Sequence, residues 1–463
     1  MGRLRAGVGA SVITPPVGYH FGTAFRYRLG KATGIHDDLW AKALVLDDGE
    51  TTLAIVGMDV VGISEECAET IRERVEEETG IPKENIMLNS THNHTSPATS
   101  LTKTLWVKPI KGPRRYMDIF PDYIAGAVIE AYNHMEKASI GVAKDILEGV
   151  TVNRRHRERP IDREVGVIRV DGRDGSPMAC LVNFPCHALA VSGEYTLWTA
   201  DFPGYTQRFL EREIPGCTCI YLQGAAGDIH PWDWWFGNLE PKHPATFEEA
   251  GRLGEIIGAE AYRLSQMIET RDEAALKARS KTITLQGRRF PWSASELEEM
   301  IKEIKARDKP WRRPCWPKNT NIANLYHHYP SGYRYSLISF LQSLLELARE
   351  GRRAPDREAE LQVFRIGDII LAANPGELFN ELGRRIKEGS PSPYTFVLPY
   401  SNGSIGYIPA KEDLKEVEKL SLRDWIEPTR SWWAYGATYT CYIAPGSGER
   451  IVEETLKLIR EVW

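Results

Sequence analysis

Three pairs of strand-like segments, each joined by a short turn, constrain the fold of this chain more than any other feature of its sequence. Each pair is rich in β-branched and other apolar residues, and the residues between its members are largely acidic or glycine, the turn chemistry of a β-hairpin. The pairs join residues 41–46 to 52–56, 165–170 to 178–182, and 361–366 to 369–373. Helix-like stretches separate the pairs, so the pattern predicts an α/β (mixed α+β) fold with mixed sheets built from hairpins and flanked by helices.

Helix boundaries are marked by capping residues. A helix is expected to begin after Ser64, whose hydroxyl can cap it, and to end at Gly80. The run Ser-Ala-Ser-Glu at 293–296 is a capping box that opens another helix. Longer helices are expected over residues 247–268 and 335–349.

The least regular stretch covers residues 310–333 and is rich in proline, tryptophan and asparagine. We expect a long surface loop there rather than a domain boundary. No internal repeat or low-complexity linker divides the chain, which favours one folded unit.

Composition excludes several classes of protein. Of the 463 residues, 42% are hydrophobic and 26% charged, and the formal net charge is −5, values typical of a folded soluble protein. No long basic stripe predicts nucleic-acid binding, and no run of eighteen apolar residues predicts a membrane span. The N-terminus has no apolar signal-like run, and the seven cysteines form no CxxC pair, so we expect a cytoplasmic protein in a reducing compartment.

The stretch STHNHTSP at residues 90–97 places His92 and His94 directly after an apolar run. On a strand, residues two apart point to the same face, about 6–7 Å from each other. The pair therefore suits either a metal or catalytic site, or an ordinary polar end of a strand.

Two other predicted strands end in residues that can bind metals. The strand 178–184 leads into His187, and the strand 369–373 leads into Glu377. Sites are often built from loops at strand ends, because a rigid sheet holds them in place. Taken singly, each residue also has an ordinary interpretation, as a buried core histidine or as a helix-initiating acid.

Eight ordered stretches together resemble the N-terminal catalytic domain of the neutral (alkaline, non-lysosomal) ceramidase family. The stretches are GVGASVITPPVG (7–18), GIHDDLWAKALVLDDG (34–49), NSTHNHTSP (89–97), VNRR with IDREVGVI (152–155 and 161–168), NFPCHALAV (183–191), LQGAAGDIHP (222–231), NPGELFNELGRR (374–385) and IGYIPAKEDL (405–414). They span nearly the whole chain, so the resemblance implies a single ceramidase-like catalytic domain over residues 1–463. The additional C-terminal β-sandwich domain of the bacterial and animal members is expected to be absent.

The resemblance also implies one zinc ion and the residues around it. The implied metal ligands are His92, His187, Glu377 and Tyr407. The implied catalytic residues are His94, Arg154 and Tyr435, and the match at Tyr435 is the weakest of these. No other cofactor is implied.

These residues imply a zinc-dependent hydrolase. Zinc lowers the pKa of a bound water to about 7, so metal-bound hydroxide would attack an amide or ester carbonyl. His94, Arg154 and Tyr435 are the expected donors to the developing oxyanion, and His94 could protonate the leaving group. Glu377 is expected at the start of a helix, whose dipole would help to keep it ionised.

The expected substrate is a small, soluble and polar molecule. The family motif H-T-H-S-G reads H-N-H-T-S here, and the family's secretion signal is not found. Arg312, Arg313 and Lys318, near Trp311 and Trp316, would suit a polar or anionic group if their loop covers the site. Ceramide amidohydrolase proper is one alternative, and a homo-oligomer is one expectation for the assembly.

A second alternative is a carbohydrate-active enzyme on the same metal-binding scaffold. Tryptophan clusters at 232–235, 311–316 and 432–433 could stack on sugar rings. A third alternative is a metal-dependent interaction protein without catalytic activity.

Further acidic residues are candidates for orienting the ligands. Asp59, Asp201 and Asp228 could accept hydrogen bonds from metal-bound histidines, because such histidines commonly donate their second N–H to a carboxylate. The glycine-rich loop 224–228 could bind an anion through its backbone N–H groups, or could be a tight turn.

Overall fold

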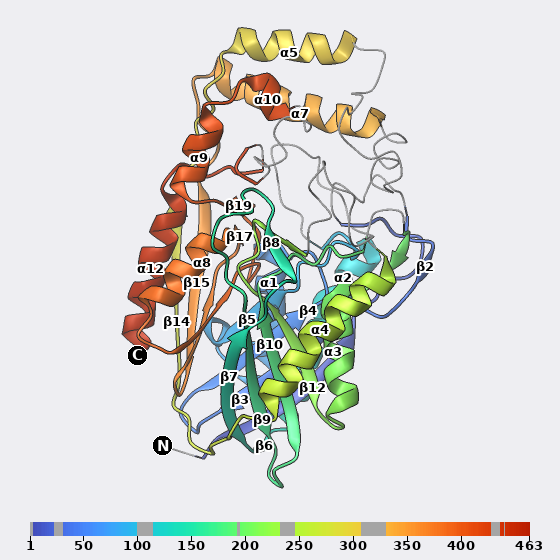
Figure 1. Cartoon of the computed structure of the whole chain (residues 1–463), viewed down its shortest axis with the longest axis vertical. Coiled ribbons are helices and arrows are strands. Elements are labelled where there is room, and N and C mark those ends of the chain that lie inside the picture. The colour runs from blue at the N-terminus through green and yellow to red at the C-terminus, as the bar shows by residue number, and fades with distance from the viewer. Residues whose placement is uncertain are drawn as a thin grey trace.

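The structure is a computed structural model that describes residues 3–22, 31–99, 114–191, 195–231, 246–306, 330–426, 436–438 and 440–463. Three main sheets form an elongated body, with helices packed on its outer sides (Figure 1). In the described part of the chain, no helix is both long and apolar enough to cross a membrane. The six described cysteines are all buried and free.

Each main sheet contains one of the predicted hairpins. The first sheet has the order β5-β4-β3-β1-β6 and consists of β1 (Arg5–Val12), β3 (Trp40–Asp47), β4 (Thr52–Met58), β5 (Ile86–Ser90) and β6 (Glu136–Lys137). The second has the order β12-β10-β9-β7 and consists of β7 (Ser139–Ile146), β9 (Glu164–Asp171), β10 (Pro177–Phe184) and β12 (Thr218–Gln223). The third has the order β14-β15-β16-β18 and consists of β14 (Leu276–Leu285), β15 (Arg357–Ile366), β16 (Ile369–Ala373) and β18 (Tyr394–Leu398). The hairpins β3–β4, β9–β10 and β15–β16 confirm the three predicted pairs.

Local turn chemistry explains the first hairpin. Gly49 adopts a φ of 89°, which a residue with a side chain rarely adopts, and its N–H donates to Asp47 Oδ1 over 3.1 Å. Asp48 Oδ1 accepts the N–H groups of Glu50 and Thr51. The acidic side chains therefore close the turn that the sequence predicted.

The described residues also form three short strand pairs. They are β2 (Gly34–Ile35) with β11 (Leu197–Trp198), β8 (Thr151–Asn153) with β13 (Ile229–Pro231), and β17 (Glu377–Leu378) with β19 (Tyr407–Ile408).

The three sheets share one apolar core. Side chains alternate between the faces of a strand, so one set faces inward and the other faces the helices. The shared core contains, among others, Leu44 and Ile55 from the first sheet, Leu181 and Ile220 from the second, and Phe364, Leu371 and Phe396 from the third. The sheets therefore pack face to face.

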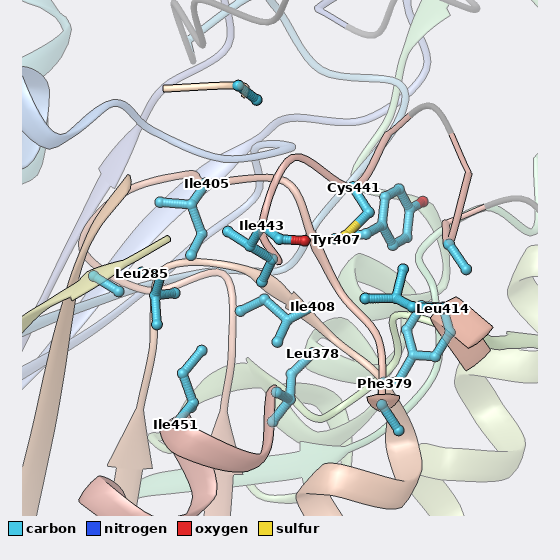
Figure 2. Packing of buried hydrophobic residues seen from close by; sticks show 14 of the residues in the cluster. Leu285, Leu378, Phe379, Ile405, Tyr407, Ile408, Leu414, Cys441, Ile443 and Ile451 are labelled. Carbon is cyan, nitrogen blue, oxygen red and sulfur yellow. Dashed lines mark hydrogen bonds between the residues drawn. The ribbon is translucent and has the colours of Figure 1, made fainter. Parts of the chain in front are cut away.

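Helices bury the outer face of each sheet. α1 (Glu65–Thr79) and α2 (Arg114–Asn133) cover the first sheet, and α3 (Asp201–Glu213) and α4 (Phe247–Ser265) cover the second. The third sheet packs against α8 (Asn380–Gly389), α9 (Lys411–Glu418) and α12 (Ser447–Val462), and the same cluster extends to α5 (Ala294–Ala306), α7 (Pro330–Arg349) and α10 (Leu422–Ile426). A short 3-10 turn, η2 (Lys83–Asn85), precedes β5. Figure 2 shows part of the cluster between the third sheet and its helices, where residues of β17 and β19 pack together.

The predicted helix boundaries are largely confirmed. Ser64 Oγ accepts the N–H of Cys67 at the start of α1, and Gly80 ends this helix with a φ of 75°. Ser293 and Glu296 form the reciprocal bonds of a capping box. The predicted loop 310–333 lies outside the described residues up to 329, and its last four residues are helical because α7 begins at Pro330.

One parallel strand pair in each main sheet determines where the site forms. The pairs are β4–β5, β10–β12 and β16–β18. Asn89, at the end of β5, accepts the N–H of Gln223 and donates to the carbonyl of Pro399. The carboxyl ends of the three parallel pairs therefore meet at one place.

Gly166→Ala should destabilise the junction between the second and third sheets. A Cβ at this position would lie 2.0 Å from Cε1 of the buried Phe396, so the ring or a strand must shift. Overpacking of this kind costs about 1–3 kcal/mol in the free energy of unfolding. Gly126→Ala in α2 is the control, because its Cβ would meet only Ser11 Oγ at 3.9 Å. Chemical denaturation of both variants measures the difference, and equal stability would contradict this packing.

Candidate metal centre

His92 and His94 lie beyond the end of β5 rather than on the strand. β5 ends at Ser90, and His92 adopts a left-handed φ of 60°. The chain turns at this point, so the two rings meet edge to face with their centroids 4.8 Å apart and their Nε2 atoms 3.2 Å apart. The pair is therefore closer than the strand spacing of the sequence analysis predicted, because a turn and not a pleat brings the rings together.

His187 joins this pair from the second sheet. It follows β10, is almost fully buried, and places its Nε2 atom 3.1 Å from Nε2 of His92. His92 Nδ1 donates to the carbonyl of Val61 over 2.7 Å, and His187 Nδ1 donates to the carbonyl of Ala226 over 2.9 Å. A carbonyl can only accept, so each Nδ1 carries a proton, and the neutral form of each ring presents its lone pair at Nε2.

Two Nε2 lone pairs at this distance repel each other unless a positive charge lies between them. Burial, and after it the charges of His92 and Arg154, hold the pKa of His187 well below its ordinary value. A proton is therefore a poor occupant at neutral pH, and a divalent cation is a better one.

Glu377 follows the third-sheet strand β16 and adds an oxygen to the same place. Its Oε2 lies 3.3 Å from Nε2 of His92 and 3.9 Å from Nε2 of His187. This atom is buried and accepts no hydrogen bond from the described residues. Glu377 belongs to β17, three residues before α8 begins at Asn380, so the expected position at a helix start is wrong.

These donors fit a metal ion of zinc's chemistry. The ligand atoms of His92, His94 and His187 all lie within 4.8 Å of one another, and Glu377 Oε2 lies beside them. Imidazole nitrogens with one carboxylate oxygen are a ligand set that zinc accepts. The described structure therefore brings together three of the four predicted ligands, His92, His187 and Glu377.

Tyr407 lies opposite Glu377 in the short parallel ladder of β17 and β19. Its buried ring is 5.2 Å from the guanidinium carbon of Arg154 and packs near Phe379. The backbone pairing thus brings Tyr407 beside the cluster, and its role as a ligand stays a prediction.

Arg154 is held in a fixed orientation near the histidines. Its Nη2 donates to the carbonyl of Gly227 over 2.5 Å, and its Nη1 lies 2.9 Å from Nε2 of His230. The ring of His230 is buried and 5.2 Å from the ring of His187, and burial lowers its pKa well below the ordinary value. His230 is therefore neutral and can accept from Arg154. The sequence analysis did not select His230, although it lies within one of the family-like stretches.

Tyr435 lies outside the described residues, so its predicted role is untested. The tryptophans at 232–235, 311–316 and 432–433 also lie outside them.

Tyr400 is a site residue that the sequence analysis missed. It follows β18, and its ring stacks on His92 with a centroid distance of 4.2 Å and an interplanar angle of 27°. No hairpin signal marks β18, because it joins the sheet through a parallel pairing. Nothing local therefore pointed to its carboxyl end.

The ring N–H groups of His92 and His187 are oriented by backbone carbonyls, not by the carboxylates that we had considered. Asp59 accepts from the N–H of Trp40, and burial raises its pKa to about 7. Asp201 accepts the N–H groups of Ala190 and Val191, in the loop after His187. Asp59 and Asp201 therefore accept hydrogen bonds from the backbone and not from the histidine rings.

Asp228 connects the loops that carry the site. Its Oδ2 accepts from Asn153 Nδ2 over 2.5 Å, and its Oδ1 accepts the N–H of Asn380 over 2.8 Å. Its own carbonyl accepts the N–H of Arg154. Asp228 therefore ties the Arg154 loop to the segment that follows Glu377.

The glycine-rich loop 224–228 is a tight turn in this structure. Gly224 N–H donates to Phe184 O, and Gly227 N–H donates to Leu378 O. A Cβ at Gly227 would lie 2.5 Å from the carbonyl oxygen of Glu377. Two of the loop's N–H groups are thus used internally, which favours the turn over the anion-binding alternative.

A second group that could hold a metal consists of His156, Asp413 and Glu416. Arg155 lies 3.2 Å from both carboxylates, and Arg159 bonds to Asp413 over 2.6 Å. The two guanidinium groups already balance the two carboxylates. The group is therefore an ion-pair network that joins the Arg154 loop to α9.

Exchanging Asn153 and Asp228 tests the connection between these loops. Asp228→Asn alone sets two amide groups against each other, so we expect a loss of about 1–3 kcal/mol in the free energy of unfolding and lower occupancy of the metal centre. Adding Asn153→Asp restores one donor and one acceptor, and should recover most of both. Thermal unfolding and metal content measure the effect. A double variant no better than Asp228→Asn would show that the hydrogen bond is unimportant.

The chain matches known proteins in sequence and in fold. Residues 5–226 match the family described as Neutral/alkaline non-lysosomal ceramidase, N-terminal. Neutral ceramidase A of Dictyostelium discoideum is 23% identical over 225 residues, which are 43% of this chain and 32% of that protein. Neutral ceramidase of Oryza sativa subsp. japonica is 24% identical over 197 residues, which are 39% of this chain and 25% of that protein. The matched segments thus span a third or less of these relatives' length.

The fold agrees over the whole chain. The crystal structure of neutral ceramidase from Pseudomonas aeruginosa superposes with a TM-score of 0.69 at 17% identity, covering all of this chain and 75% of that one. A structure described as ceramidase complexed with C2 superposes with a TM-score of 0.71 at 16% identity and the same coverage. The sequence match includes His92, His94, Arg154 and His187, and the structural match extends to the third sheet. Over residues 5–226, slightly less than half of its length, the chain is therefore similar to the neutral/alkaline non-lysosomal ceramidase family.

Proposed function

We propose that this protein is a zinc-dependent hydrolase that cleaves an amide or ester bond of an acyl substrate. The observation that carries this proposal is the arrangement of His92, His187 and Glu377, in which two imidazole Nε2 atoms and one buried carboxylate oxygen lie within 3.9 Å of one another. The similarity of residues 5–226 to a family of hydrolases supports it.

His92, His187 and Glu377 would hold the zinc ion, and Tyr407 is the proposed fourth ligand. A bound zinc ion supplies Lewis acidity, which polarises a carbonyl and lowers the pKa of water. The carbonyls of Val61 and Ala226 keep both imidazoles in the tautomer that this role requires.

His94 and Arg154 would act on the substrate. Arg154 is a fixed positive charge beside the cluster and would stabilise the oxyanion that develops at the cleaved carbonyl. His94 is partly exposed, unlike His92 and His187, and would donate a proton to the leaving nitrogen or oxygen. Tyr435 remains the proposed second oxyanion donor.

We propose a soluble and polar acyl substrate. The support is the sequence between 311 and 318, where arginine, lysine and tryptophan predominate. The names of the relatives favour ceramide as the alternative substrate. A carbohydrate substrate rests on the tryptophan clusters alone. A cytoplasmic location and a homo-oligomer stay predictions.

Metal analysis of histidine variants tests the ligand set. The wild type should contain about one zinc ion per chain, and His92→Ala and His187→Ala should lose most of it, because each removes a facing Nε2 atom. His94→Ala should keep the metal and lose about 100-fold or more in kcat, as expected for a lost proton donor. The exposed His134→Ala is the control and should behave like the wild type.

Two results would contradict the ligand assignment. One is a wild type without metal, and the other is loss of metal in His94→Ala as large as that in His92→Ala.

A substrate panel tests the proposed specificity. Short- and long-chain ceramides in detergent are compared by kcat/KM with N-acyl amino acids, aryl esters and oligosaccharides. We expect a soluble amide or ester to be the best substrate. Long-chain ceramide as the best substrate would overturn the polar assignment while leaving the metal site intact, and activity on oligosaccharides alone would overturn the hydrolysis of acyl bonds.

A further inference from the structure

Tyr400 has an unusual backbone conformation beside the metal centre. Its φ is 59°, in the left-handed region that tyrosine rarely adopts. Two backbone bonds hold it there, because its N–H donates to Gly376 O and its carbonyl accepts the N–H of Ser90. The residue is thus fixed between the end of β5 and the segment that leads to Glu377. Strained backbone of this kind is concentrated at functional sites.

The phenol ring of Tyr400 lies directly on the histidine cluster. It stacks on His92 at 4.2 Å and meets His187 edge to face with centroids 6.5 Å apart. Only 4% of the residue is exposed to solvent.

The hydroxyl of Tyr400 is buried and has no hydrogen-bond partner among the described residues. Other buried tyrosines have one: Tyr116 donates to the carbonyl of Ile13, and Tyr221 donates to the carbonyl of Phe184 over 3.0 Å. Buried hydroxyl groups are almost always paired, because water can no longer satisfy them. An unpaired hydroxyl at this place therefore points to a partner that binds there.

Tyr400 would act as a donor. A phenol has an ordinary pKa of about 10, so it carries its proton at neutral pH. Its preferred partner is therefore an acceptor oxygen, such as that of a carbonyl group.

We propose that Tyr400 is a further catalytic residue, whose hydroxyl donates a hydrogen bond to an acyl oxygen of the substrate bound beside His92. This inference rests on the proposed function, since that function supplies the acyl group. The hydroxyl is in position before the substrate binds. The unfavourable free energy of burying it unpaired therefore lowers the stability of the fold, and the hydrogen bond it forms later stabilises the bound substrate and the transition state.

Tyr400→Phe removes the hydroxyl and keeps the ring on His92. It should lower kcat/KM about 100-fold, the typical loss for one oxyanion donor. The metal-free variant should be as stable as the wild type or more stable, because an unpaired buried hydroxyl is removed. Zinc content should not change.

Tyr116→Phe is the matched control. It is a similarly buried tyrosine in the apolar cluster of the first sheet, and its hydroxyl donates to the carbonyl of Ile13. It should have a lower Tm and a kcat/KM within about threefold of the wild type. We therefore expect Tyr400→Phe to lose activity without losing stability, and Tyr116→Phe to lose stability without losing activity.

Binding of acetohydroxamate to the zinc-loaded protein gives a readout that needs no turnover. Calorimetry should show about tenfold weaker binding to Tyr400→Phe than to the wild type, the loss expected for one hydrogen bond. Unchanged binding and activity, a lower Tm of metal-free Tyr400→Phe, or loss of zinc would each overturn the proposal. A wild type that hydrolyses no acyl substrate would defeat the proposed function, and the binding comparison would still decide whether Tyr400 donates to an acyl oxygen.

Discussion

Asn89 joins the three sheets at the point on which the site depends. Its side chain accepts a hydrogen bond from β12 in the second sheet and donates one to Pro399 after β18 in the third, while its own backbone belongs to β5 in the first. An amide can do this because it carries a donor and an acceptor on one short side chain. The bonds fix the carboxyl ends of three parallel pairs together, so one metal-binding residue or pair can come from each sheet. His92 and His94 follow β5, His187 follows β10, and Glu377 follows β16.

The electrostatics of the cluster follow from backbone hydrogen bonds. Val61 O and Ala226 O hold the protons of His92 and His187 on Nδ1, which turns both lone pairs toward the same point. The free energy of bringing these lone pairs and the Glu377 carboxylate together is unfavourable for the empty site, and a cation offsets it. Arg154 is kept beside the cluster by its bonds to Gly227 and His230. The loops that supply these partners are in turn held by Asp228.

The sequence predicted the features whose signals are local. The hairpins β3–β4, β9–β10 and β15–β16 and the caps at Ser64 and Ser293 each depend on a few adjacent residues, and all are present. Parallel pairings have no connecting turn, so β5, β12 and β18 could not be assigned partners, and Tyr400 was missed with them. The position of Glu377 before α8, and not at its start, also depends on the pairing of β17 with β19 across the fold.

The site residues were predictable only as an ordered set. Taken alone, each of His92, His187 and Glu377 has an ordinary structural interpretation. Only the order of the family-like stretches predicted that the three residues bind one metal ion together. These residues lie close together because the carboxyl ends of strands from three sheets meet, and no local sequence pattern predicts that meeting. The positive φ of His92 shows the difference, since the strand alternation inferred from H-x-H places the rings too far apart.

A crystal structure of the zinc-loaded protein, with anomalous diffraction at the zinc edge, tests the metal centre most directly. We expect one anomalous peak about 2.0–2.2 Å from Nε2 of His92, Nε2 of His187 and Oε2 of Glu377, the usual zinc–ligand distances. Protein that contains zinc but shows its peak elsewhere, or bound through other residues, would contradict the account.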